Sequence, residues 1–112
     1  MKVRQRDIVL IKFPFSDLTG AKVRPALVIS NDEYNLKKLD AVVLAMTSNL
    51  TRLEYKVVVT NKDLEDGSLP VKSAVRVDKP FSILQSKILK IQAKLNHSKL
   101  EEVKQKISNL LQ

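Results

Sequence analysis

The chain has 112 residues, the length of one ordinary domain, and 44% of them are hydrophobic, which is enough for one modest core. The absence of cysteine and the single histidine, His97, exclude disulfide frameworks, thiol nucleophiles and thiolate or His-rich metal sites, and the low aromatic content of 4% argues against a base-stacking platform. The net charge of +8 favours a polyanionic partner, nucleic acid before an anionic membrane, although a solvated lysine-rich surface carries the same excess.

The first third of the chain predicts two strands, a connecting turn and a short helix. Ile8–Phe13 is a dense apolar run that indicates a strand buried on both faces, and the turn formers of residues 15–22 follow it. Ala26–Ile29 predicts the second strand, and the proline before it suits the first residue of a strand because proline has no N–H to donate. Ser30–Glu33 has the form of a capping box and predicts a helix that ends near Leu39.

The middle of the chain predicts three more strands. They are Ala41–Met46, Tyr55–Thr60 and Ser73–Val77, each rich in apolar and β-branched residues. Asn61–Gly67 is expected to be an acidic turn in which the glycine closes a brief helical segment. Two later segments are short and either extended or helical, namely Phe81–Leu84 and Ile88–Ala93.

The C-terminal segment predicts an amphipathic helix over residues 99–111. Ser98–Glu101 forms a second capping box, His97 before it is expected in a loop, and apolar residues then recur at helical spacing: Leu100, Val103, Ile107, Leu110 and Leu111. Five short strands with two or three helices predict a single domain over residues 1–112, mainly β with peripheral helices. We expect a small barrel or a curved antiparallel sheet with a C-terminal amphipathic helix.

The positive charge is concentrated at the two ends, with +4 in residues 1–30 and +6 in residues 71–112 against −2 between them. No run reaches the ~18 apolar residues that a membrane helix needs, and the first seven residues lack the apolar segment of a secretory signal. We therefore expect a cytoplasmic protein with no membrane partner.

Three motifs follow one another along residues 7–80. The first runs from Asp7-Ile-Val through a glycine-containing loop to Arg24-Pro-Ala-Leu-Val-Ile-Ser30, the second is Val42-Val-Leu-Ala-Met-Thr47-Ser48, and the third is Ser73-Ala-Val-Arg76-Val-Asp78-Lys-Pro80. In this order they resemble the PemK/MazF family, the toxins of type II toxin–antitoxin pairs. The third motif of that family has glutamine or lysine directly before its proline, and the second commonly has proline where this chain has Met46.

The resemblance implies an SH3-like barrel, usually a homodimer, that cleaves single-stranded RNA without a metal ion or other cofactor. It also implies a cognate antitoxin that covers the site. Cleavage of this kind uses the 2′-OH of the RNA to attack the adjacent phosphorus. It needs a base for that proton, an acid for the leaving 5′-oxygen and positive charge for the phosphorane.

Arg76 and Asp78 are candidates for this chemistry because side chains two apart on a strand share a face, while Val75 and Val77 point to the core. Asp78 can act as the base. Arg76 can clamp phosphate oxygens, and the resemblance implies an arginine acid at this element, so its role is acid or oxyanion clamp. A surface ion pair between the two is the alternative.

Arg24 is expected to project from the barrel mouth, and the resemblance makes it the catalytic or phosphate-binding arginine; a solvated cation beside a strand is the alternative. The hydroxyl of Thr47 can bond a phosphate oxygen or the 2′-OH, with Ser48 assisting, unless both form only a strand exit. By position, the loop that holds Ser16, Thr19 and Lys22 is expected to cover the RNA.

The sequence thus favours a metal-independent, sequence-selective endoribonuclease toxin for messenger RNA, with Arg24, Thr47, Arg76 and Asp78 as catalytic residues. The alternative is a non-catalytic nucleic-acid-binding barrel, or a toxin that poisons a protein target such as gyrase, since a fold does not decide a function.

Overall fold

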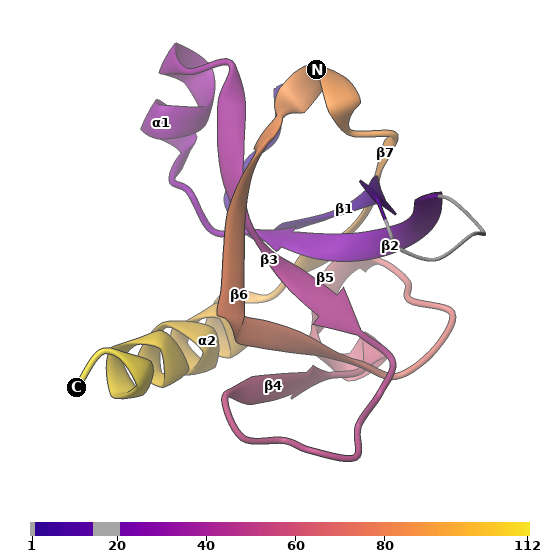
Figure 1. Ribbon diagram of the computed structural model, residues 1–112, viewed down its shortest axis with the longest axis vertical. Coiled ribbons are helices and arrows are strands. Elements are labelled where there is room, and N and C mark those ends of the chain that lie inside the picture. Colours follow the sequence, from indigo (N-terminus) through magenta and orange to yellow (C-terminus); the bar gives the residue numbers. More distant parts are fainter. Residues whose placement is uncertain (1, 15–20) are drawn as a thin grey trace.

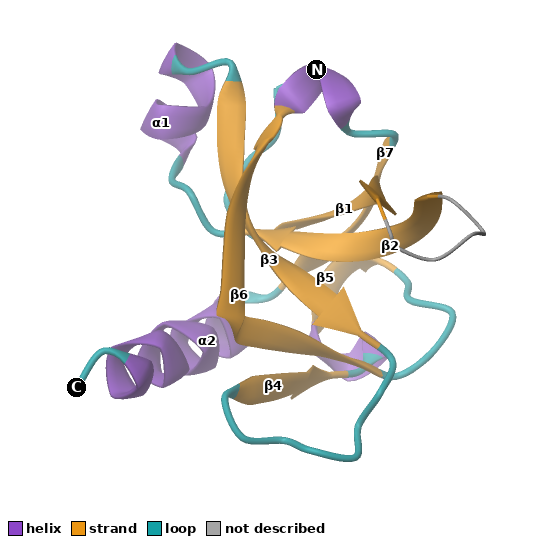
Figure 2. Ribbon diagram, viewed as in Figure 1, coloured by secondary structure: helices purple, strands orange, loops and turns teal. Residues whose placement is uncertain are grey.

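One antiparallel sheet of seven strands, curled into a half-barrel, makes up most of the fold (Figure 1; Figure 2). The computed structural model describes residues 2–14 and 21–112, and the seven strands are those found within these residues. The strands follow one another in the sheet in the order β4-β6-β3-β2-β1-β7-β5. Their bounds are β1 Asp7–Pro14, β2 Ala21–Val28, β3 Asp40–Thr47, β4 Lys56–Val59, β5 Leu64–Gly67, β6 Ser73–Leu84 and β7 Lys90–Leu95. The predicted class, mainly β with a curved antiparallel sheet, is confirmed.

All five predicted strands are present, but the expected number of strands was too low by two. β5 lies inside the segment expected as an acidic turn, where only the 3₁₀ helix Asn61–Asp63 is helical, and Gly67 ends the strand instead of closing a helix. The residues of β5 are mostly polar and lack the apolar alternation that predicts a strand. The segment is a strand because it pairs with β7. The undecided segments are also extended, since Phe81–Leu84 continues β6 and Ile88–Ala93 mostly belongs to β7.

Both predicted helices form, and both begin at a different N-cap from the one expected. α1 spans Asp32–Lys37 and α2 spans His97–Leu110, and an asparagine caps each. The Asn31 side chain accepts a hydrogen bond from the Tyr34 N–H at 2.8 Å, and the Asn96 side chain accepts one from the Lys99 N–H at 2.7 Å. The capping-box predictions at Ser30 and Ser98 were therefore wrong. The Ser30 hydroxyl is held elsewhere, as it accepts a hydrogen bond from the Val42 N–H.

Three single residues also differ from their predicted positions. Pro25 lies within β2 rather than at its start, and the pairing of β2 with β3 begins at Ala26, directly after the proline that has no N–H to donate. Arg24 is consequently a mid-strand residue, opposite Ile11 of β1. His97 is the exposed first residue of α2 and not part of a loop.

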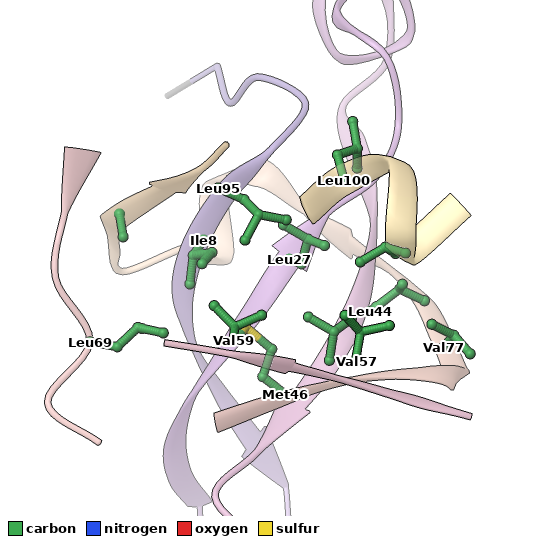
Figure 3. Packing of buried hydrophobic residues seen from close by; sticks show 13 residues of the cluster. Ile8, Leu27, Leu44, Met46, Val57, Val59, Leu69, Val77, Leu95 and Leu100 are labelled. Carbon is green, nitrogen blue, oxygen red and sulfur yellow. The ribbon is translucent and has the colours of Figure 1, made fainter. Parts of the chain in front are cut away.

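Buried apolar side chains form two clusters, one on each face of the sheet. Neighbouring residues of β1 and β2 alternate between them: Ile8 and Leu27 belong to the larger cluster, and Val9 and Val28 to the smaller. The larger cluster includes the α2 residue Leu100 together with strand residues (Figure 3). Helix α2 therefore packs against this cluster, next to β6 and β4.

The apolar stripe of α2 is confirmed for most of its length. Leu100 and Val103 are buried and Ile107 packs against the larger cluster, whereas Leu111 lies beyond the helix and is exposed, contrary to expectation. No helix in the described part of the chain is long and apolar enough to cross a membrane.

Gly67 holds edge strand β5 against β7, and we expect Gly67→Ala to destabilise the fold. Its φ of +73° favours glycine, and an added Cβ would overlap the Gln92 carbonyl oxygen and lie 2.7 Å from Ala93 Cα. The free energy of unfolding should fall by about 2 kcal/mol, measured by urea denaturation. Ser68→Ala, at the exposed neighbouring position, should leave it unchanged. If Gly67→Ala were as stable as the unmodified protein, the close approach of β5 to β7 would not require glycine at this position.

Candidate functional site

A large bulge in β6 lies where β6 leaves β3 and turns toward β4. Met46 of β3 pairs with Val75 and Leu44 pairs with Pro80, so the single residue Ala45 stands opposite residues 76–79 of β6. Within that stretch β6 pairs with β4 instead, through Arg76 and Lys56. The long strand bends visibly at this point (Figure 1). A bulge of this kind redirects side chains away from the regular alternation of a strand.

A pocket of about 380 Å³ opens at the bulge, and we call it the bulge pocket. It brings together three of the four predicted catalytic residues, Arg24 from β2, Thr47 from the end of β3 and Arg76 from β6. These strands are neighbours in the sheet, which explains how residues far apart in sequence converge. The complete lining is Phe13, Arg24, Ala45, Met46, Thr47, Arg76, Lys79, Pro80 and Phe81.

A second pocket, of about 280 Å³, lies on the other side of Arg24 and Thr47, which line both pockets. We call it the strand-end pocket. Its polar lining includes two predicted RNA-binding residues, Lys22 and Ser48, and its remaining lining is Leu10, Val23, Pro25, Met46, Leu69, Pro70, Val71, Ser73 and Gln92. Arg24 and Thr47 thus stand between two hollows.

Asp78, the fourth predicted catalytic residue, lines neither pocket and lies beside Arg76. Its carboxylate Oδ2 is 3.6 Å from Arg76 Nη2, and both side chains are 36% exposed. The expected alternation holds here, because Val75 and Val77 are buried. Arg76 Nε is buried and has no hydrogen-bond partner among the described residues.

The Thr47 hydroxyl is held in place by the turn that follows β3. Its Oγ1 accepts a hydrogen bond from the Asn49 N–H at 3.0 Å, and the Asn49 side chain in turn accepts one from the Thr51 N–H at 2.9 Å. An oxygen that already accepts from the backbone keeps its O–H as a donor. Thr47 can therefore donate to a phosphate oxygen in the bulge pocket.

Two predicted RNA-binding residues, Ser16 and Thr19, lie outside the described residues. The sequence-based assignment of roles missed Lys79, Phe13 and Phe81, which line the bulge pocket. The two rings meet edge to face, with centroids 5.3 Å apart, although β2 and β3 separate β1 from β6 in the sheet. Only the curl of the sheet joins them, so no spacing along the chain could have indicated the contact. Lys79 stood within the third motif and could have been considered from sequence.

Two side chains with shifted pKa values lie away from these pockets. A hydrogen bond to Glu102 is the main cause that raises the pKa of Lys99, and one to Asp40 raises the pKa of Tyr34. Within residues 2–14 and 21–112, no three His, Cys, Asp or Glu side chains are grouped closely enough to hold a metal ion. The positively charged side chains that line the bulge pocket are those of Arg24, Arg76 and Lys79.

Comparison with known proteins gives one decisive match. Residues 4–111 match the model of the PemK-like, MazF-like toxins of type II toxin–antitoxin systems. The chain belongs to this family. The resemblance inferred from the three motifs is thereby confirmed over nearly the whole chain, including the segment after residue 80.

Solved structures of the PemK/MazF type share the fold at low sequence identity. A MazE–MazF crystal structure from Deinococcus radiodurans superposes with a TM-score of 0.80 at 24% identity, covering 99% of this chain and 96% of the other. An endoribonuclease from a mycobacterial species gives 0.77 at 14%, covering 99% and 92%. Another, in complex with its cognate antitoxin, gives 0.77 at 16%, covering 97% and 94%. Comparison with curated proteins by sequence gives no match.

Proposed function

We propose that this PemK/MazF-family chain, acting as a single domain, is a toxin that cleaves single-stranded RNA, messenger RNA above all, without a metal ion. The observation that carries the proposal is the convergence of Arg24, Thr47 and Arg76 on one pocket, with Asp78 paired to Arg76 at its rim. Two cations and a hydroxyl donor in one hollow suit a phosphate group, whose developing charge they would stabilise in the transition state.

In this proposal each residue has a distinct role. Arg24 and Arg76 hold the non-bridging oxygens of the scissile phosphate, and the Thr47 hydroxyl donates a hydrogen bond to one of them. Asp78 accepts the proton of the 2′-OH, whose oxygen attacks phosphorus and expels the 5′-oxygen. Asp78 is the carboxylate beside Arg76 and is exposed to an incoming ligand, so it is the group proposed as the base. Of the two roles left open for Arg76, we assign the clamp, since a guanidinium holds its proton too tightly to serve as an acid.

The two hollows supply a basis for sequence selectivity. With the phosphate at Arg24 and Thr47, the nucleotides on either side lie over the bulge pocket and the strand-end pocket. Lys22 and Ser48 of the strand-end pocket then contact the RNA. Ser16 and Thr19 are proposed as further RNA-binding residues.

We also propose a cognate antitoxin and a homodimer as partners, and the cytoplasm as the place of action. Two related solved structures pair a toxin with MazE or with a cognate antitoxin, which supports the first partner. Support for the dimer comes from Leu36, Leu39 and Leu84, apolar side chains that are largely exposed. Leu84 pairs with Asp40, directly after Leu39, so two of the three are neighbours that a second copy would cover.

The test is a digest of a mixed single-stranded RNA pool by purified protein that is free of antitoxin. We expect cleavage at a restricted set of sequences, products that end in a 2′,3′-cyclic phosphate and a 5′-hydroxyl, and the same rate with EDTA. Protein purified identically with Arg24→Ala controls for contaminating nucleases. An intact pool would overturn the proposal in favour of a non-catalytic barrel, and inhibition by EDTA would overturn metal independence.

A further inference from the structure

The proposed reaction still lacks an acid. When the P–O5′ bond breaks, the leaving oxygen must gain a proton or depart as a costly alkoxide. Guanidinium groups are poor donors because their pKa lies above ~12, whereas a lysine ammonium is ordinarily near ~10.4 and is the stronger acid. The pocket needs a proton donor besides its two arginines.

Lys79 lies where such a donor is required. It lines the bulge pocket together with Arg24, Thr47 and Arg76, and it is the last residue of the β6 bulge before Pro80 resumes pairing with β3. In a regular strand Lys79 would share the face of Val77, which is buried in the core. The bulge removes that constraint, and Lys79 lines the same pocket as the phosphate-binding residues.

The surroundings of Lys79 leave its ammonium available. The side chain is exposed, and no carboxylate among the described residues forms an ion pair with it. Asp78, its neighbour, is instead paired with Arg76 at 3.6 Å. The pair holds Arg76 at the pocket rim as a clamp, while Lys79 keeps all three of its N–H donors for a ligand.

We propose that Lys79 is a further catalytic residue, the general acid that protonates the leaving 5′-oxygen; this inference rests on the proposed RNA cleavage. In the step, the 2′-oxygen forms a bond to phosphorus as its proton passes to Asp78, and the P–O5′ bond breaks as a proton passes from Lys79 Nζ to O5′. The products are a 2′,3′-cyclic phosphate and a 5′-hydroxyl. Asp78 and Lys79 then return to their starting states by proton exchange with water.

A substrate that needs no acid tests this role directly. Once the digest has identified a cleaved sequence, that oligonucleotide is made with the bridging 5′-oxygen of the scissile bond replaced by sulfur, since a thiolate leaves without protonation. Lys79→Gln, which removes the ammonium and keeps a polar side chain, should cleave the oxygen substrate about 10²-fold more slowly than the unmodified protein in single-turnover assays. It should cleave the sulfur substrate nearly as fast as the unmodified protein.

Two control variants separate acid catalysis from binding. Lys62→Gln removes an equal charge from an exposed position that lines neither pocket, and it should leave both substrates unaffected. Arg76→Ala, which removes the clamp, should slow both substrates alike. Thermal melting of each variant confirms that it is folded.

Every other outcome overturns the role of Lys79. Full activity of Lys79→Gln on the oxygen substrate would show that the amine is dispensable. An equal loss of activity on both substrates would show that the amine only binds phosphate. In both cases the proposed RNA cleavage itself stands. If the unmodified protein cleaves no RNA, the proposed function fails first and the role of Lys79 fails with it.

Discussion

Arg24→Ala is expected to abolish RNA cleavage while leaving the fold intact. Arg24 lines both pockets and stands where we propose that the scissile phosphate lies, so its loss should remove charge stabilisation from the transition state. We expect a fall in kcat of at least about 10²-fold to 10³-fold. The rate is measured on the oligonucleotide identified in the digest, with the products separated by electrophoresis.

Arg24→Lys provides the matched comparison. It keeps the positive charge and loses the planar fork that holds two phosphate oxygens at once, so it should recover little of the lost rate. Thermal unfolding should show that both variants are folded. Activity of Arg24→Ala close to that of the unmodified protein would remove Arg24 from the site.

Gln85→Met is expected to lower the free energy of unfolding strongly. Gln85 is 4% exposed, and its Oε1 accepts a hydrogen bond from the Val3 N–H at 3.0 Å. Its Nε2 donates to three backbone carbonyls at 2.9–3.1 Å, those of Asn35, Lys38 and Asp40. One side chain thus ties the N-terminal segment, the end of α1 and the start of β3 together.

Methionine fills similar space, but it removes the acceptor of the Val3 N–H and the amide donor of the three carbonyls, of which the Lys38 carbonyl keeps a hydrogen bond from Lys2 Nζ at 2.8 Å. The free energy of unfolding should fall by about 3 kcal/mol, and the melting temperature by on the order of 10 °C. Gln92→Met is the control, because Gln92 donates only to the Ser68 carbonyl near the surface. Circular dichroism during heating measures both variants. A shift for Gln85→Met no larger than that for Gln92→Met would contradict the role of Gln85.

The sequence predicted most strands and helices correctly, and it failed for the features that depend on contacts with other parts of the fold. Ile8–Phe13 and Ala41–Met46 were placed nearly correctly because buried strands and apolar runs coincide. β5 was missed because its polar residues carry no strand signal, and it exists because β7 offers an edge to pair with. The helix caps were misassigned because asparagine and serine are both good caps, and only the network around Ser30 shows why it is otherwise engaged.

The candidate site also combines residues that the sequence predicted with one that only the fold places there. The motifs singled out Arg24, Thr47, Arg76 and Asp78, and the sheet brings the first three to one pocket while Asp78 reaches it only through Arg76. Lys79 stood in the third motif but was given no role, and strict alternation would place it on the face of Val77, which is buried. The place of Lys79 in the pocket lining depends on the bulge in β6, and no local sequence pattern predicts this bulge.

By itself, the sequence determined the family, the mainly β class and the kind of chemistry that a chain with one histidine and no cysteine can perform. These follow from composition and from motifs that are contiguous along the chain. The tertiary structure decided which cations share a pocket, because that depends on strand order and on one residue of β3 facing four of β6. The surplus of eight positive charges pointed only to a polyanion, and the fold places three of those cations, Arg24, Arg76 and Lys79, in the lining of one pocket.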